Sequence, residues 1–266
     1  MALGRRPSPQ RRAVYAAAAA VFAFLMLPLV VILPVSFTSS EYLGFPPPGF
    51  SLRWYEAYFA DPVWIAATLR SLAIATAVTV LATLLGTLLA FSIVRGRYPG
   101  RTLVSQIATA PLAVPTIVYS VAVYGLFSAL KIVGNWQGIA LAHTVHALPF
   151  VVLIMGAALR TVDPAQEQAA MGLGASRLGA ILRITLPQLR PALISSAFLA
   201  FISSFDELVI AMFLGGANMT LPKKMFDNIQ MEIEPTVAAV AMLQIALAAF
   251  VLALAARFGS GARVLN

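Results

Sequence analysis

Two adjacent carboxylates, Asp206 and Glu207, interrupt an apolar run that otherwise extends over residues 191–214. A charge at membrane depth costs at least a few kcal/mol, so such residues usually face a bundle interior or a water-filled path. Asp206 lies about 22 Å along this run at about 1.5 Å per helical residue. Adjacent helical positions diverge by about 100°, so one carboxylate can line a path for a cation while the other pairs elsewhere. The alternative is a structural role, with Arg70, Lys223 or a helix N-terminus as the partner.

Other chemistry is sparse in this sequence. His143 and His146 are three residues apart and can share a helix face, but no carboxylate or cysteine stands near them in the sequence. They make a poor metal site, and a buried, hydrogen-bonded pair is the expected arrangement. The chain has no cysteine, which excludes disulfides and thiolate chemistry. It has no Gly-x-x-x-x-Gly-Lys-Ser/Thr run for nucleotide phosphates, so we expect no ATP or other cofactor bound by this chain. Asp206 and Glu207 with the distant histidines are too few for a catalytic site, so we do not expect an enzyme.

The composition shows which kind of scaffold must position these residues. The 266 residues are 60% hydrophobic and only 11% charged, with a mean hydropathy of +0.88. Soluble domains carry about 25% charged residues, so a soluble monomer, a disordered chain and a coiled coil are all excluded. The composition predicts a polytopic membrane protein.

Six apolar runs are long enough to cross the membrane, which takes about 20 helical residues for roughly 30 Å of hydrocarbon. We expect spans at residues 13–37, 71–94, 102–130, 139–159, 191–214 and 236–256. Prolines within them predict kinks at Pro28, Pro34, Pro111, Pro115 and Pro149. The fold class is therefore all-α, with residues 1–266 forming a single transmembrane domain of six helices.

The basic residues orient these spans. Thirteen of the 18 Lys and Arg residues lie before the first span or after the second, fourth and sixth. They are Arg5, Arg6, Arg11, Arg12, Arg95, Arg97, Arg101, Arg160, Arg177, Arg183, Arg190, Arg257 and Arg263. The other five are Arg53, Arg70, Lys131, Lys223 and Lys224. Because cytoplasmic loops carry the excess of Lys and Arg, we expect both termini to be cytoplasmic.

The first span has a basic segment before it, as a signal peptide does. Its apolar run is too long, contains two prolines and lacks an Ala-x-Ala exit, so we expect an uncleaved anchor. The next segment, residues 41–64, contains Trp54, Tyr55, Tyr58, Phe59 and Trp64. These aromatic residues predict a short helix at the outer membrane surface.

The loop at residues 160–190, between the fourth and fifth spans, has strong local signals. Asp163 can cap a helix whose first residue is Pro164, and Glu167 lies in its first turn. Gly174 is placed to end this helix.

A second helix is expected over residues 175–184, stopping before Pro187. Small residues on the first helix would let another surface approach closely; they are Ala165, Ala169, Ala170 and Gly172. The two short helices would form a rigid knob that docks into a partner. A solvated connecting loop is the alternative.

Within this loop, Gln168-Ala169-Ala170, Gly174 and Leu186-Pro187 form a spaced pattern. The pattern resembles the cytoplasmic signature loop of the permease subunits of ATP-binding-cassette importers: Glu-Ala-Ala, three residues, Gly, and later Leu-Pro. Gln168 replaces the family's glutamate, although Glu167 stands immediately before it. The resemblance implies that residues 163–187 insert a coupling helix into a cleft of the ATPase subunit. The implied coupling residues are Glu167, Gln168, Ala169, Ala170, Gly174, Ala175, Leu186 and Pro187.

Other segments are similar to the branch of this family that serves spermidine and putrescine uptake. They are residues 50–55 (Phe-Ser-Leu-Arg-Trp-Tyr), residues 203–210 (Ser-Ser-Phe-Asp-Glu-Leu-Val-Ile), Leu221-Pro222 and Glu234-Pro235-Thr236. Polyamine members of that branch carry two adjacent acidic residues where this chain has Asp206-Glu207. The resemblance implies a small cationic amine as substrate, with a polyamine favoured. An aminophosphonate, an opine or an amino-acid-like amine is the alternative.

The resemblance also implies a type I importer permease (MetI-like) fold in the bacterial inner membrane, and a set of partners. These are a second permease subunit, two ATPase subunits that bind ATP and Mg, and an external solute-binding protein. A stand-alone secondary transporter or channel would show internal repeats or repeated charged pore residues, and none is evident. A membrane-embedded enzyme would need a catalytic constellation. Association with an ATPase separates the importer from both alternatives.

Overall fold

The computed structural model describes residues 9–231 and 233–259. Three members of the predicted cytoplasmic set, Arg5, Arg6 and Arg263, lie outside these residues. The described chain is helical, and the β-pairing within it is an isolated antiparallel bridge between Thr38 and Phe50. The all-α fold class is confirmed.

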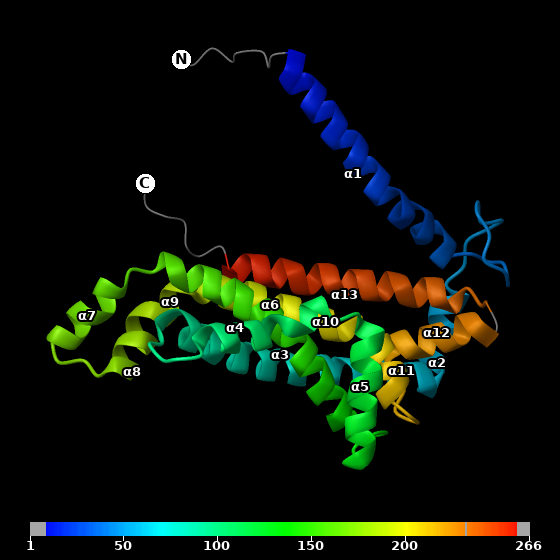
Figure 1. Ribbon diagram of the computed structural model, residues 1–266. Helices are drawn as coiled ribbons and strands as arrows, with labels where there is room; N and C mark the ends of the chain where they lie inside the picture. Colours follow the sequence, from blue (N-terminus) through cyan, green and yellow to red (C-terminus); the bar gives the residue numbers. More distant parts are fainter. Residues whose placement is uncertain (1–8, 232, 260–266) are drawn as a thin grey trace. The chain divides into compact units, whose positions relative to one another are not determined.

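The helices follow one another along the chain as Figure 1 shows. They are α1 (Pro9–Ser36), α2 (Arg53–Ala60), α3 (Pro62–Arg95), α4 (Arg101–Thr109), η1 (Ala110–Ala113), α5 (Thr116–Ala129), α6 (Trp136–Thr161), α7 (Pro164–Gly172), α8 (Arg177–Ala180), η2 (Ile181–Thr185), α9 (Leu186–Gln188), α10 (Arg190–Phe205), α11 (Val209–Leu214), α12 (Leu221–Met231) and α13 (Thr236–Gly259).

Four of these helices are long and apolar enough to cross a membrane: α1, α3, α6 and α13. Two further spans are possible if each of two bent helix pairs counts as one: Arg101–Ala113 with Thr116–Ala129, and Arg177–Gln188 with Arg190–Phe205. The first pair lies in the apolar run 102–130 and bends by 110°. Pro115 stands at the bend with ψ 133°, and a proline cannot donate the hydrogen bond that would continue the preceding helix.

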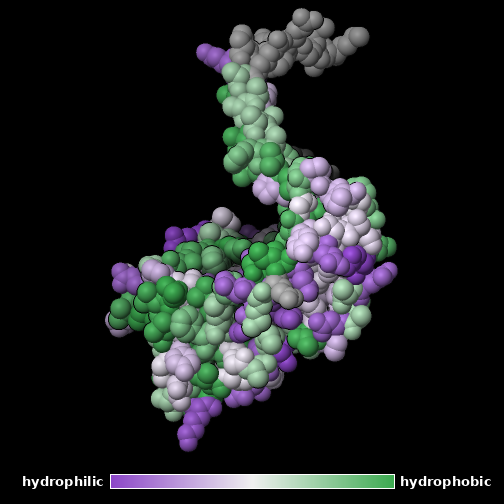
Figure 2. Space-filling view, turned by 90° about the vertical axis from the view of Figure 1, so that its right-hand side faces the viewer, coloured by the Kyte–Doolittle hydropathy of each residue, from purple (hydrophilic) through white to green (hydrophobic). Residues whose placement is uncertain are grey.

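The chain divides into two compact units, Met1–Asp61 with Asn228–Ile245 and Pro62–Asp227 with Ala246–Asn266. In the first unit, α1 is a column of hydrophobic side chains (Figure 2) with a mean hydropathy of 2.7 over its candidate span. The predicted short aromatic helix is α2. Its Trp54 donates from Nε1 to the Ser40 carbonyl oxygen at 3.2 Å, and the Tyr55 hydroxyl lies 2.9 Å from Ser36 Oγ. These bonds fix α2 to the end of α1 and the loop that follows it.

In the second unit, helices α3, α6 and α10 pack against one another and form the core. The buried face of α3 repeats every three or four residues and consists mainly of small side chains, including Ala75, Ala82, Gly86 and Ala90. A Cβ atom on Gly86 would lie 2.6 Å from Val151 Cβ on α6. Small residues therefore let these two helices approach closely, as they do in membrane helix interfaces.

Candidate functional site

The first half of the predicted knob is α7. The Asp163 side chain accepts a hydrogen bond from the Ala165 N–H at 2.9 Å, and Pro164 is the first helical residue. At the other end Gly174 has φ +93°, and the N–H groups of Gly174 and Ala175 donate to the carbonyls of Met171 and Ala170, both at 3.0 Å. This pair of bonds is a Schellman cap, which favours glycine because an L side chain is strained at that φ. Both predicted ends of the helix are confirmed.

The second half of the knob is one continuous helical segment from Arg177 to Gln188. Ser176 caps it by accepting a hydrogen bond from the Gly179 N–H at 3.1 Å. The prediction that this helix stops before Pro187 was wrong. A π-helical turn, η2, precedes the proline, and the Leu186 N–H donates to the Ile181 carbonyl. A widened turn lets the helix continue past Pro187, because it relieves the clash between the proline ring and the preceding carbonyls.

Glu167 is the internal anchor of the knob. It is buried, and its Oε1 accepts a hydrogen bond from Thr185 Oγ1 at 2.7 Å and lies 3.6 Å from Arg95 Nε at the end of α3. Arg95 also donates from Nη2 to the Val162 carbonyl at 2.6 Å. These contacts join α7, η2 and α3. Sequence reasoning placed Glu167 in the helix but missed Arg95 and Thr185, which lie far from it along the chain.

The surface of the knob exposes apolar side chains among polar ones. Gln168, Ala169, Gly174, Ala175 and Pro187 are exposed, while Ala170 and Leu186 are half-buried. Four apolar side chains beside them are also exposed: Leu173 (91%), Leu178 (64%), Leu182 (51%) and Met171 (39%). We call these four residues the knob patch. They were not among the predicted coupling residues. Large apolar residues in a loop with several arginines are a signal from which this exposed surface could have been predicted. An exposed apolar patch of this kind is typical of a protein-docking surface.

The two carboxylates in the 191–214 run lie where the helix breaks, between α10 and α11. Glu207 Oε1 accepts a hydrogen bond from the Ile210 N–H at 3.0 Å, and Oε2 lies 3.8 Å from His146 Nε2. Asp206 is exposed, and in the described chain its carboxylate has no hydrogen-bond or ion-pair partner. The two acidic residues therefore differ: one stabilises the start of α11 and the other is open to a ligand.

The basic residues considered as structural partners for the carboxylates are engaged elsewhere. Arg70 donates to the Met219 carbonyl at 3.0 Å, and Lys223 pairs with Asp227 at 2.7 Å. The third predicted kind of partner, a helix N-terminus, is present: the start of α11 donates a hydrogen bond to Glu207.

The histidines have polar neighbours that the sequence did not reveal. His143 is buried, with Nδ1 2.9 Å from Ser204 Oγ on α10, while His146 faces Glu207. No carboxylate stands near the histidines in the sequence, but the fold brings Glu207, at the break between α10 and α11, next to His146. Over residues 9–231 and 233–259, no three His, Asp or Glu side chains converge to hold a metal ion.

Residues 82–264 match the family of binding-protein-dependent transport system inner membrane components. The putrescine transport system permease protein of Escherichia coli strain K12 is 36% identical over 230 residues, covering 84% of this chain and 82% of the relative. A spermidine/putrescine transport system permease protein of Haemophilus influenzae is 32% identical over 228 residues, covering 85% and 88%.

Among solved structures, a chain of a bacterial ABC transporter involved in the import of the acidic polysaccharide alginate superimposes with a TM-score of 0.76. The match covers 97% of this chain and 99% of that chain at 17% sequence identity. At this identity the likeness establishes the fold, which is that of an importer permease.

Proposed function

The chain belongs to the family of binding-protein-dependent transport system inner membrane components, and from this premise we propose that it carries a polyamine across the membrane. It is a multi-pass permease subunit of an ABC importer and not an enzyme. Our proposal concerns its substrate, its path and its partners. The chain forms half of a translocation path for putrescine or spermidine, and a second permease subunit forms the other half.

Two observations support a polyamine. The relatives that match over most of this chain are named for putrescine and spermidine transport. In addition, the exposed carboxylate of Asp206 follows the last residue of α10 without a partner in the described structure. Polyamines are cationic at neutral pH, and a carboxylate in a poorly hydrated path attracts such a cation strongly. Asp206 is therefore the proposed substrate-path residue, while Glu207 supports the helix break beside it.

The knob formed by α7 to α9 is the proposed coupling element. Its knob patch would enter a cleft of the ATPase subunit, and Glu167 would transmit the ATPase movement to α3 through Arg95. ATP and Mg would be bound by that partner. The excess of basic residues in the loop that contains the knob and beside the termini supports a cytoplasmic location for this loop and both termini. A solute-binding protein would deliver the substrate from the opposite side.

The composition of the native complex tests this arrangement. The chain is purified from its native membranes in a gentle detergent, and the intact mass of the complex is measured with its stoichiometric partners identified. We expect one copy of this chain, one different permease chain and two ATPase subunits. A chain that purifies alone, under conditions where related complexes survive, contradicts the importer assembly.

The substrate is tested separately by uptake in reconstituted vesicles that contain the complex and its solute-binding protein. We expect ATP-dependent uptake of labelled putrescine or spermidine, and no competition by an aminophosphonate or an opine. Uptake of an aminophosphonate instead of a polyamine would leave the permease role intact and contradict the substrate.

A further inference from the structure

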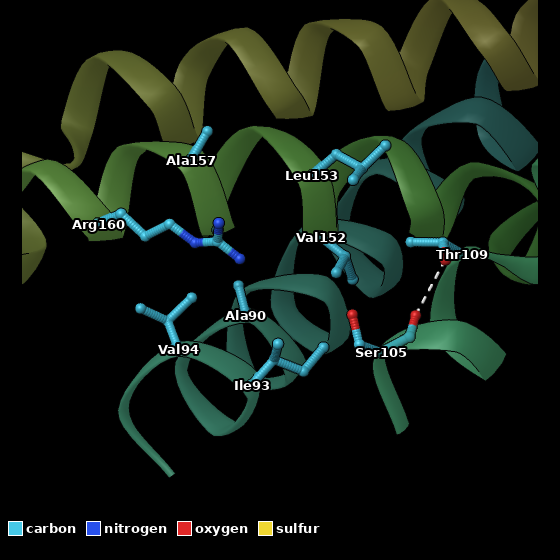
Figure 3. A pocket seen from close by; sticks show the side chains of 10 residues that line it. Ala90, Ile93, Val94, Ser105, Thr109, Val152, Leu153, Ala157 and Arg160 are labelled. Carbon is cyan, nitrogen blue, oxygen red and sulfur yellow. Dashed lines mark hydrogen bonds between the residues drawn. The ribbon is translucent and has the colours of Figure 1, made fainter. Parts of the chain in front are cut away.

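A pocket with a basic rim lies between α3, α4 and α6, at the edge of the core (Figure 3). Its volume is about 190 Å³, and its wall is mainly apolar, with Ala90, Ile93, Val152 and Leu153 among its lining side chains. Gly156 lies in the wall and leaves room there, since a Cβ on it would make only an ordinary contact of 3.9 Å with Val94.

Polar side chains also line this pocket, among them Ser105 and Arg160. A second hollow of about 320 Å³ shares Ile93, Val94, Ser105 and Arg160 with the first and adds Arg101 and Thr102. Figure 3 shows the Arg160 side chain extending from α6 over the pocket. The two hollows together thus form a short apolar slot that opens beside two guanidinium groups and two hydroxyl groups.

The charge of this rim is not neutralised within the described chain. Arg160 is exposed and has no hydrogen-bond or ion-pair partner there, and Arg101 donates only to the Gly96 carbonyl at 3.3 Å. No acidic residue lines either hollow. Arg95 is only a few residues from Arg101 but pairs with Glu167 and donates to the Val162 carbonyl. The rim therefore suits an anionic group supplied from outside the chain.

The position of the pocket along the helices indicates which anion it takes. Arg160 is the penultimate residue of α6, and the knob begins at Pro164. The rim consequently lies where the apolar α6 gives way to the polar loop, and we expect lipid headgroups at this level. An arginine at such a helix end extends its charge to the interface while its stem stays in apolar surroundings.

We propose that this pocket binds an anionic phospholipid. The phosphate would be held between Arg160 and Arg101, with the hydroxyls of Thr102 and Ser105 beside it, and part of one acyl chain would fill the apolar slot. Basic pockets between transmembrane helices bind anionic lipid headgroups in this way. The lipid would brace α4 against α3 and α6, next to the Arg95–Glu167 contact that carries the knob.

The test measures lipid bound to the purified complex by native mass spectrometry during titration with phosphatidylglycerol or phosphatidylcholine. We expect phosphatidylglycerol to be retained in preference, and Arg160→Gln to lower its retention about fivefold. Gly156→Leu fills the slot without touching the rim, and should also lower retention. Arg97→Gln removes an exposed charge near the end of α3 that lines neither hollow, so it is the matched control and should retain the lipid normally. The readout is bound mass, so it is independent of the transported substrate.

Three results would overturn the proposal. Equal retention of phosphatidylglycerol by the wild-type complex and the Arg160→Gln variant would show that the rim does not hold the headgroup. Displacement of the lipid by inorganic phosphate alone, with Gly156→Leu unaffected, would indicate a free-anion site without an acyl chain. Disulfide crosslinking of Leu153→Cys to a cysteine scan of the second permease would indicate that a protein helix fills the slot.

Discussion

Glu167 unites the knob with the transmembrane helices, although it is the neighbour of the residue that the family pattern emphasises. Replacing Glu167 with Gln leaves the Arg95 guanidinium without its counter-ion in a mostly buried site. The change also removes the charge that accepts the hydrogen bond from Thr185 Oγ1. A hydrogen bond to a charged group contributes about 1.5–3 kcal/mol, so we expect a lower melting temperature of the purified complex. We also expect weaker stimulation of ATP hydrolysis by the loaded solute-binding protein. Thermal unfolding and ATPase assays on the same preparation measure both effects.

Gln168→Ala is the matched control for this change, because Gln168 is exposed and lies on the outer side of α7. It should leave the melting temperature within error of the wild type. If Gln168→Ala lowered the melting temperature as much as Glu167→Gln, the anchoring role of Glu167 would be wrong.

Asp206 and Glu207 are expected to give different phenotypes although they are adjacent. Asp206→Asn removes an exposed charge that has no partner in the described structure, so the fold should be unaffected. If this charge contacts the substrate amine, its loss should raise the polyamine concentration for half-maximal uptake by about tenfold or more. Uptake by reconstituted vesicles measures this change.

Glu207→Gln is the informative comparison, because it weakens the contacts with the Ile210 N–H and His146. It should lower the melting temperature, whereas Asp206→Asn should not. Unchanged uptake with Asp206→Asn in a normally assembled complex would remove Asp206 from the substrate path.

At the scale of the elements, the close approach of α3 and α6 depends on Gly86. Gly86→Ala introduces a Cβ that would lie 2.6 Å from Val151 Cβ, so the helices must separate or Val151 must move. Overpacking of this kind costs about 1–3 kcal/mol. Thermal unfolding of the purified complex should show the loss. Adding Val151→Gly should restore part of the stability, because it removes the Cβ atom that clashes.

Gly125→Ala on α5 makes the same chemical change where nothing lies within 4 Å of the new Cβ. It should not destabilise the complex. Equal melting temperatures for Gly86→Ala and Gly125→Ala would contradict the close packing of α3 and α6.

The turn between α7 and α8 depends in the same way on Gly174. Gly174 has φ +93°, so Gly174→Ala would be strained by roughly 1–2 kcal/mol. We therefore expect the Schellman cap to loosen in this variant. Hydrogen exchange at the amides of Gly174 and Ala175 should become faster. Gly172→Ala, inside α7 with nothing within 4 Å, should leave exchange unchanged or slow it. Faster exchange in Gly172→Ala than in Gly174→Ala would contradict this account of the turn.

These elements also show which parts of the fold could be predicted from the sequence. Asp163 and Gly174 act through bonds within a few residues, so their positions alone predicted both ends of α7. The Arg95–Glu167 contact joins residues far apart in the chain, and no local pattern specifies such a pairing. Pro115 predicted a kink, but the size of the 110° bend depends on what packs around it. Likewise, the 191–214 run predicted a helix at membrane depth, yet it breaks at its two carboxylates, where Glu207 binds the start of α11.

At the scale of the whole molecule, the knob patch should decide whether the chain assembles with its ATPase. Leu173 is 91% exposed and lies at the turn between the two halves of the knob, so its side chain contributes little to the fold of the isolated chain. Leu173→Asp would place a charge in an interface that we expect to be apolar. A buried unpaired charge commonly costs about 3–5 kcal/mol, which would weaken ATPase binding by at least a hundredfold.

Co-purification of the ATPase with the tagged permease measures this loss, and Leu43→Asp is the matched control. Leu43 is also exposed, at 40%, but it lies in the loop between α1 and α2, which we expect from the charge distribution to be on the external side of the membrane. Leu43→Asp should retain the ATPase, whereas Leu173→Asp should lose it and keep the second permease, because the charge affects only the knob. Retention of the ATPase by Leu173→Asp would move the docking surface away from the knob patch. Loss of both partners would show that Leu173 supports the fold itself, which its exposure argues against.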